Sequence, residues 1–141
     1  LKTAGFRAPI QKNIRDEIRL KLIGNLSFNP ISALTGATLE QICNDQGTEA
    51  IVRSMMTEAK IIAEKLGAKI NMSIEKRIDG ARKVGAHKTS MLQDIEVGKP
   101  IEIDSIIIAV KELGELTCSP TPYIDTILNL TLQKAKLIGC L

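Results

Sequence analysis

The feature that most constrains this chain is the helical spacing of its hydrophobic residues. In the segment of residues 51–66, hydrophobic side chains recur at steps of three and four residues, the period of an amphipathic helix. Residues 124–138 repeat the pattern after Thr121-Pro122, a capping residue followed by proline at the first helical position. Gly67 and Gly139 follow the two segments and are typical of helix ends. Two long amphipathic helices are therefore predicted.

Shorter helices are expected at residues 13–28, 39–44, 74–84, 91–97 and 101–113, from capping residues and periodic hydrophobic positions. The first should end at Asn29-Pro30, because the residue before a proline disfavours helical backbone. Besides Thr121, we expect caps at Thr38, Thr48, Ser73 and Ser90. Residues 68–72 and 101–103 alternate like strands but are too short to form a sheet. The predicted class is all-α, a helical bundle.

Composition narrows the functional classes. The chain has 141 residues, enough for one domain with a core, at 44% hydrophobic and 25% charged. Its longest apolar run, Ile106–Val110, is far shorter than the ~20 residues of a membrane-spanning helix. A net charge of +3, with bases and acids interleaved and three aromatic residues in all, argues against a nucleic-acid partner.

Cysteine and histidine give no sign of a metal site. Cys43, Cys118 and Cys140 are odd in number, far apart and without metal-ligand spacing, which predicts reduced thiols in a cytoplasmic protein. His87 has no partner at ligand or triad spacing and is expected on a loop or surface. Because the chain starts at Leu1 rather than at methionine, we expect it to be a piece of something longer.

Polar residues climb one side of the first predicted helix. At about 100° per residue, Lys21, Asn25 and Asn29 lie within one sector of about 80°. Three hydrophobic residues lie within this sector or at its edge: Ile14, Ile18 and Leu22. Polar side chains among buried ones are costly unless they have hydrogen-bond partners. These three residues, which we call the polar ladder, are therefore a candidate binding site. The structural alternative is that Lys21 snorkels to solvent while the two amides bond loop backbone.

A second candidate segment is Ser90-Met91-Leu92-Gln93-Asp94, with Glu102 twelve residues after Ser90. Taken alone, Ser90-x-x-Gln93 fits a capping box. Glu102 would likewise be an ordinary acid in the first turn of a helix, stabilised by the helix dipole.

Together, these two motifs bear a resemblance to a known family. Lys21-x3-Asn25-x3-Asn29-Pro30, followed by Ala33-Leu34 and then by Ser90-Met91-Leu92-Gln93-Asp94-Ile95 and Ile101-Glu102-Ile103-Asp104, resembles the C-terminal domain of ketopantoate reductase (2-dehydropantoate 2-reductase). The resemblance begins at Ala4-Gly5-Phe6, which is similar to the family's interdomain joint, and covers nearly the whole chain. It implies a joint at residues 1–12 and a helical substrate and catalytic domain at residues 13–141.

The resemblance also implies roles for the matching residues. Lys21 is similar to the family's proton donor, which protonates the keto oxygen as NADPH delivers hydride to the adjacent carbon; an ammonium group suits that task. Asn25 and Asn29 resemble substrate-binding amides, and Glu102 resembles an acid that contacts the cofactor. The segment implied to hold the substrate at the opposite wall comprises Ser90, Met91, Leu92 and Gln93.

Two positions depart from the family pattern. Arg19 stands where family members commonly carry Trp, and Leu39 stands where some use a substrate-binding Asn, so a related 2-oxo acid is an alternative to ketopantoate. No G-x-G-x-x-G occurs in the chain, so NADPH is expected to bind an N-terminal Rossmann domain that these residues lack, and the isolated chain is expected to be inactive.

Three functions remain open at this stage. The resemblance favours the catalytic domain of a pantothenate-biosynthesis oxidoreductase, with a 2-oxo acid substrate and a homodimer among its partners. The alternatives are a non-catalytic helical dimerisation module and a small-ligand-binding domain without redox chemistry.

Overall fold

The structure, a computed structural model, describes residues 5, 14–70 and 73–141. Apart from Gly5, the expected interdomain joint at residues 1–12 lies outside the described residues. Within the described ranges the secondary structure is helical and no strand occurs, which confirms the all-α class.

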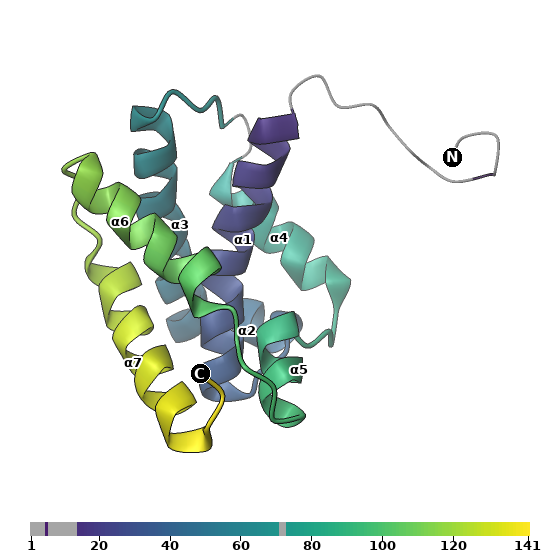
Figure 1. Ribbon diagram of the computed structural model, residues 1–141. Helices are drawn as coiled ribbons and strands as arrows, with labels where there is room; N and C mark the ends of the chain where they lie inside the picture. The colour runs from purple at the N-terminus through teal and green to yellow at the C-terminus, as the bar shows by residue number, and fades with distance from the viewer. Residues whose placement is uncertain (1–4, 6–13, 71–72) are drawn as a thin grey trace.

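The helices surround a central first helix (Figure 1). In chain order they are α1 (Ile14–Thr35), α2 (Leu39–Asn44), α3 (Gln46–Lys65), α4 (Ile74–Val84), α5 (Ser90–Glu96), the π-helical segment η2 (Asp104–Ile108), α6 (Ala109–Leu116) and α7 (Pro122–Ile138). Helix α1 contacts α2, α3, α5, η2 and α7, so it lies at the centre of one continuous core. The long helices α3 and α7 are the two that periodicity predicts most strongly, and both are confirmed.

The core is aliphatic and sulfur-rich, in keeping with the scarcity of aromatic residues. Leu26 of α1, Val52 of α3 and Ile124 of α7 are 0% exposed. Met55 and Met56 are also fully buried, where their flexible side chains fill the space between helices. None of the described helices is both long and apolar enough to cross a membrane.

The expected break at Asn29-Pro30 is wrong. Helix α1 continues through Pro30 to Thr35 and ends only at Gly36, whose φ of +74° suits glycine. Pro30 and Ile31 are buried, so tertiary packing overrides the local cost of proline within a helix. The hydroxyl of Thr35 donates to the carbonyl of Ile31 at 2.7 Å and satisfies one acceptor of the last turn.

Local capping signals predict some helix starts correctly and miss others by one to a few residues. The caps Thr38 of α2 and Ser73 of α4 are confirmed. Helix α3 begins earlier than expected, because Asp45 rather than Thr48 is its N-cap and accepts the Thr48 N–H at 2.8 Å. Helix α5 is capped by Thr89, so Ser90 is its first residue and not its cap.

The single helix expected at residues 101–113 is also corrected. Residues 101–102 are not helical, and the helix then runs as η2 followed by α6, three residues beyond the expected end. The backbone N–H of Ile101 donates to the carbonyl of Cys140 at 3.0 Å, a contact that ties the start of this segment to the end of the chain. Short π-helical segments within helices occur frequently at functional sites.

The start of α7 at Pro122 and its left-handed cap at Gly139 are confirmed, yet Thr121 makes no side-chain cap. The carboxylate of Glu58 on α3 caps α7 instead. Its two oxygens accept the backbone N–H groups of Tyr123 and Ile124, each at 2.9 Å. Glu58 is only 9% exposed, so this buried charge is held by helix-terminal donors.

Candidate functional site

The polar ladder of α1 passes from solvent into the bundle. Lys21 is exposed, Asn25 is half-buried and Asn29 is 5% exposed. Of the hydrophobic residues near this sector, Leu22 is half-buried against the core, but Ile14 and Ile18 are not in the core as the pattern suggested, since they are 60% and 59% exposed. The core face of α1 is formed instead by Ile23, Leu26 and Ile31. Only the Lys21 end of the ladder therefore lies on the open, partly apolar surface of the first half of α1, whereas Asn29 lies inside the bundle.

Asn29 joins the ladder to the second motif. Its side-chain Nδ2 donates to the hydroxyl of Ser90 at 3.5 Å, a long hydrogen bond across 61 positions of sequence. Helix α5 packs against α1 and so places Ser90 beside the buried end of the ladder. The contact uses one N–H of the amide and one lone pair of the hydroxyl, so both groups keep bonding capacity for a third polar group.

Ser90 also lines a cleft that contains Glu102. The cleft has a volume of about 160 Å³ and is formed by Ser90, Met91, Asp94, Glu102 and Ile106. Two carboxylates and one hydroxyl thus share a small space with two hydrophobic side chains. Ile106 belongs to the π-helical η2, so this irregular segment forms one wall.

The other residues of the second motif have different surroundings. Met91 and Leu92 are core residues, 2% and 4% exposed, so their side chains position α5, although Met91 also borders the cleft. Gln93 is exposed, and its Nε2 donates to the carbonyl of Lys88 at 2.8 Å. Asp94 also lines the cleft, although the family resemblance implies no role for this last residue of the Ser90–Asp94 motif.

Lys21 is separate from the cleft in this structure. It lies two turns before Asn29 on α1, about 12 Å along the helix axis at ~1.5 Å per residue. Among the described residues, Lys21 and Glu102 take part in no side-chain hydrogen bond or ion pair, with each other or with a third group. The described contacts thus bring Asn29, Ser90 and Glu102 together. Lys21 and Asn25 lie nearer the N-terminus of α1 and are not part of this cluster.

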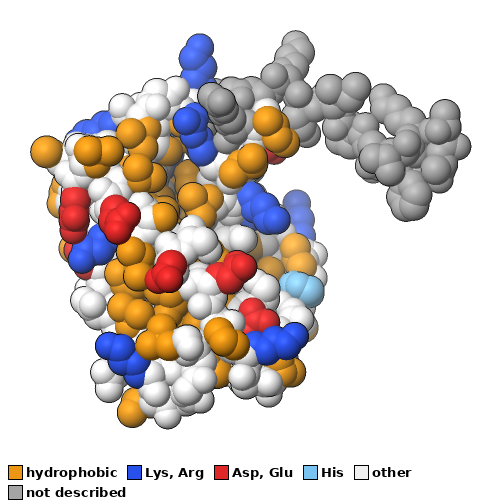
Figure 2. Space-filling model, in the orientation of Figure 1, with side chains coloured by type: hydrophobic (Ala, Val, Ile, Leu, Met, Phe, Trp, Pro, Cys, Tyr) orange, Lys and Arg blue, Asp and Glu red, His pale blue; other side chains and the backbone are white. Residues whose placement is uncertain are grey.

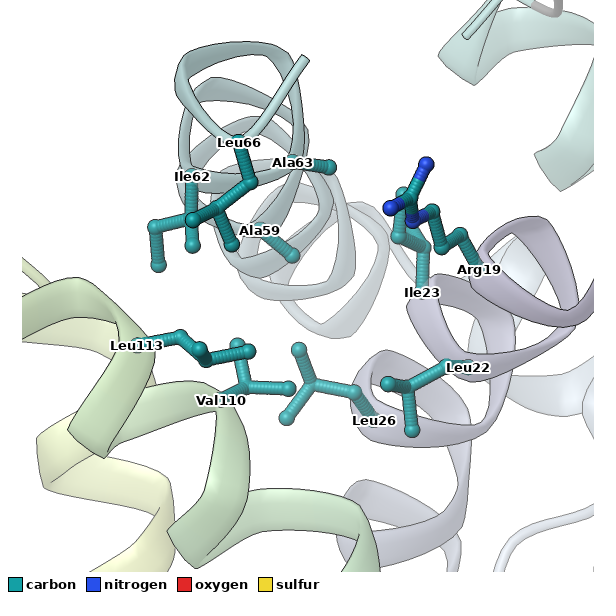
Figure 3. A pocket seen from close by; sticks show the side chains of 10 residues that line it. All are labelled: Arg19, Leu22, Ile23, Leu26, Ala59, Ile62, Ala63, Leu66, Val110 and Leu113. Carbon is teal, nitrogen blue, oxygen red and sulfur yellow. The ribbon is translucent and has the colours of Figure 1, made fainter. Parts of the chain in front are cut away.

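A different hollow lies behind this surface (Figure 3). It measures about 70 Å³, lies between α1, α3 and α6, and is lined by Arg19 and nine hydrophobic residues, among them Leu26, Ile62 and Val110. Arg19 and Lys21 are about 200° apart around α1, so the two side chains lie on opposite faces of the helix. The departure of Arg19 from the family pattern therefore falls on this apolar hollow and not on the ladder.

Charge on the front face of the bundle is mixed. Figure 2 shows acidic and basic side chains interspersed with hydrophobic ones, with no continuous basic patch on the face it presents. The site can therefore offer an ammonium group, two amides, a hydroxyl and carboxylates to one small ligand. Such a set offers both hydrogen-bond donors and hydrogen-bond acceptors to a small polar ligand.

Comparison with known proteins gives a consistent result. The family described as "Ketopantoate reductase PanE/ApbA C terminal" matches residues 13–135. A 2-dehydropantoate 2-reductase of Mesorhizobium japonicum is 55% identical over 137 residues, which cover 97% of this chain and 42% of that protein.

Solved structures share the fold. A protein of the ketopantoate reductase type from Ralstonia solanacearum has a TM-score of 0.89 at 40% identity over 98% of this chain and 42% of its own. The 2-dehydropantoate 2-reductase of Methylococcus capsulatus has a TM-score of 0.88 at 28% identity, over 98% and 48%. The chain thus spans less than half the length of the relatives it matches. It belongs to the ketopantoate reductase family and corresponds to the C-terminal helical domain of its members.

Proposed function

We propose that the chain is the substrate-binding and catalytic half of an NADPH-dependent reductase that converts 2-dehydropantoate, or a related 2-oxo acid, to the 2-hydroxy acid. The observation that carries this proposal is the continuity from the Lys21–Asn25–Asn29 ladder to the Ser90–Glu102 cleft through the Asn29–Ser90 hydrogen bond. A ligand on this surface would meet donors along α1 and acceptors at the cleft.

In this proposal, Asn25, Asn29 and Ser90 bind the substrate and Lys21 transfers the proton. Asn25 and Asn29 orient the substrate through their amides, and Ser90 donates its hydroxyl hydrogen to a substrate oxygen. Lys21 holds a proton on Nζ, stabilises the negative charge that develops on the keto oxygen, and then protonates that oxygen. Such stabilisation acts in the transition state, where it raises kcat more than it lowers KM.

NADPH would supply the hydride to the keto carbon. The described residues form no strand, and the chain has no Gly-rich dinucleotide turn, so its contribution to a cofactor site is limited to the edge of the cleft. There the Glu102 carboxylate lacks a partner among the described residues and can accept a hydrogen bond from a hydroxyl or amide group of the cofactor.

The exposed isoleucines support a covering domain. Ile14 and Ile18 leave about 60% of their surface to solvent beside Lys21, as an interdomain face would. We therefore place the dinucleotide-binding domain of the full-length protein over the first half of α1. Its closure would exclude water from the ladder, which strengthens the interaction between an ammonium group and a developing alkoxide.

The test is Lys21→Ala in the full-length protein, with kcat and KM for 2-dehydropantoate and the Kd for NADPH measured separately. Loss of a general acid lowers kcat by about 10²–10⁴-fold, whereas the NADPH Kd should change little. Lys83→Ala on α4 is the matched control, since Lys83 is exposed and remote from the ladder, and its kcat should stay near wild type. Near-wild-type kcat in Lys21→Ala would contradict the proposal, as would NADPH oxidation by the 141-residue chain alone.

A further inference from the structure

Arg77 of α4 reaches α1 beside the polar ladder. Its guanidinium group occupies the space over Gly24, where the Cβ of any other residue would come within 2.7 Å of Nε and 2.9 Å of Cζ. Gly24 itself is buried, in keeping with a side chain that covers it. The absence of a side chain at position 24 therefore lets a cation from α4 lie directly on the surface of α1.

The guanidinium group is a near neighbour of Lys21. Gly24 follows Lys21 by three residues, and residues with this spacing lie side by side on a helix surface, with Cβ positions about 5–6 Å apart. At about 100° per residue, the position of Gly24 is about 60° from that of Lys21, on the side away from Asn25. Arg77 thus adds a second cation at the exposed end of the polar ladder.

This cation has no partner among the described residues. Nε of Arg77 is buried and makes no hydrogen bond. Nη1 and Nη2 likewise make no hydrogen bond or ion pair with a described group, and they are not fully buried, so a ligand can reach them. The acids of α4 are engaged elsewhere, since Glu75 pairs with Arg53 and Asp79 pairs with Arg82.

Such an arrangement is costly for the fold alone. A buried donor without a partner loses its hydrogen bonds to water, and an unsatisfied group of this kind calls for an explanation. Lys21 and Arg77 also repel each other, and in the described part of the chain neither is paired with a carboxylate, that of Glu17 one turn before Lys21 included. An anion beside the two cations would offset the repulsion and accept hydrogen bonds from the accessible nitrogens.

We propose that Arg77 binds the carboxylate of the 2-oxo acid substrate while Lys21 holds the keto oxygen. This inference rests on the function proposed above. The carboxyl carbon of a 2-oxo acid is bonded directly to the keto carbon, so the group that binds the carboxylate has to lie next to the proton donor, as the guanidinium over Gly24 does. A guanidinium group also suits a planar carboxylate, to which it donates paired N–H groups. Arg77 thus selects 2-oxo acids over uncharged ketones.

Arg77→Met in the full-length protein tests this, because it removes the charge and keeps most of the length of the side chain. The KM for 2-dehydropantoate should rise about 10- to 100-fold, the usual effect of losing a charge-assisted hydrogen bond, and kcat should stay within about threefold. The Kd for NADPH should not change. A phosphate of the cofactor is the other anion a reductase brings here, and a raised NADPH Kd with an unchanged KM would assign Arg77 to it and overturn the proposal.

Lys76→Met is the matched control, since Lys76 is the exposed cation next to Arg77 on α4. Its KM should stay within about twofold of wild type, and a rise equal to that of Arg77→Met would mean that net charge and not a contact is responsible. Arg77→Lys keeps the charge but not the planar fork, so it should recover part of the lost affinity.

Gly24→Ala tests the position of the guanidinium group without removing its charge. The added Cβ would displace the group, so the KM should rise as it does in Arg77→Met. The double variant should have a KM within about twofold of that of Arg77→Met, because the displaced group is already gone, and additive effects would contradict the proposal. Gly80→Ala on α4, where a Cβ meets nothing within 4 Å, is the control and should keep the wild-type KM.

Thermal unfolding of each variant separates binding from folding. A lower Tm with an unchanged KM would make Arg77 a structural residue and refute its role in binding. An unchanged KM in Arg77→Met, beside the loss of kcat expected for Lys21→Ala, would overturn this inference and leave the proposed function intact. A full-length wild-type protein that reduces no 2-oxo acid would contradict the proposed function itself, and this inference with it.

Discussion

The side chains of Asn29 and Ser90 meet at 3.5 Å between α1 and α5, although 61 positions separate them in the sequence. This contact links the two motifs that carry the family resemblance. A bond at the upper limit of hydrogen-bonding distance contributes little to stability by itself. In the proposed enzyme, this contact holds the Asn29 amide and the Ser90 hydroxyl close together, and both groups can still form hydrogen bonds to a substrate.

Ser90→Ala and Asn29→Ala should therefore each raise KM for the 2-oxo acid in the full-length protein by about 2- to 13-fold, the equivalent of ~0.5–1.5 kcal/mol for one neutral hydrogen bond. A double-mutant cycle on the free energy of unfolding should give a coupling below about 0.5 kcal/mol. A large coupling with unchanged KM would mean that the pair serves the fold and not the substrate.

Glu58→Ala should destabilise the chain by about 1.5–3 kcal/mol, because the N–H groups of Tyr123 and Ile124 lose a charged acceptor in a buried setting. Glu58→Gln keeps one acceptor oxygen and should lose less. Chemical denaturation gives the free energy of unfolding of both variants. Glu64→Ala is the control, since it removes only an exposed pair with Lys60 and should cost at most about 0.5 kcal/mol. Equal effects of Glu58→Ala and Glu64→Ala would contradict the capping role.

Gly114→Ala should destabilise the bundle by about 1–3 kcal/mol, because a Cβ there would lie 2.9 Å from Cγ2 of Thr121 and 3.3 Å from the carbonyl oxygen of Ser119. Gly80 offers a matched contrast. It lies within α4 with nothing near the position of a Cβ, so Gly80→Ala should stabilise by about 0.5–1 kcal/mol. The Tm of each variant, measured by thermal unfolding, tests both expectations. A lower Tm for Gly80→Ala would contradict the open surroundings of Gly80.

Asp45 makes part of the stability pH-dependent. The hydrogen bond from the Thr48 backbone N–H lowers the pKa of Asp45 below its ordinary value of 3.8. A carboxylate with a lowered folded-state pKa contributes stability above its unfolded pKa, and this contribution is lost as pH falls through the folded pKa. Asp45→Asn should therefore have a lower Tm than wild type near pH 7, and the difference should shrink as the pH falls below about 4, where the carboxylate of the wild type is protonated. Parallel Tm–pH curves for the two proteins would contradict this.

Local signals in the sequence determine most of the helices. The Thr38 capping box, the Ser73 cap and the start of α7 at Pro122 each depend on residues within one turn of each other, and all three are found as expected. The pattern of α3 is equally clear, apart from the choice between Asp45 and Thr48 as its cap. The motif residues of the candidate site were identified in the same way, through a resemblance in local order and spacing.

Only the tertiary structure decided the features that depend on distant partners. Helix α1 passes through Pro30 because burial of its second half outweighs a local penalty, and α7 is capped by Glu58 from 65 positions away. Ile14 and Ile18 fit a core pattern, yet they are exposed because no described element of this chain covers their face of α1. Periodicity fixes which residues share a helix face, whereas the free energy of burial depends on what that face meets, and this is set by segments far away in sequence.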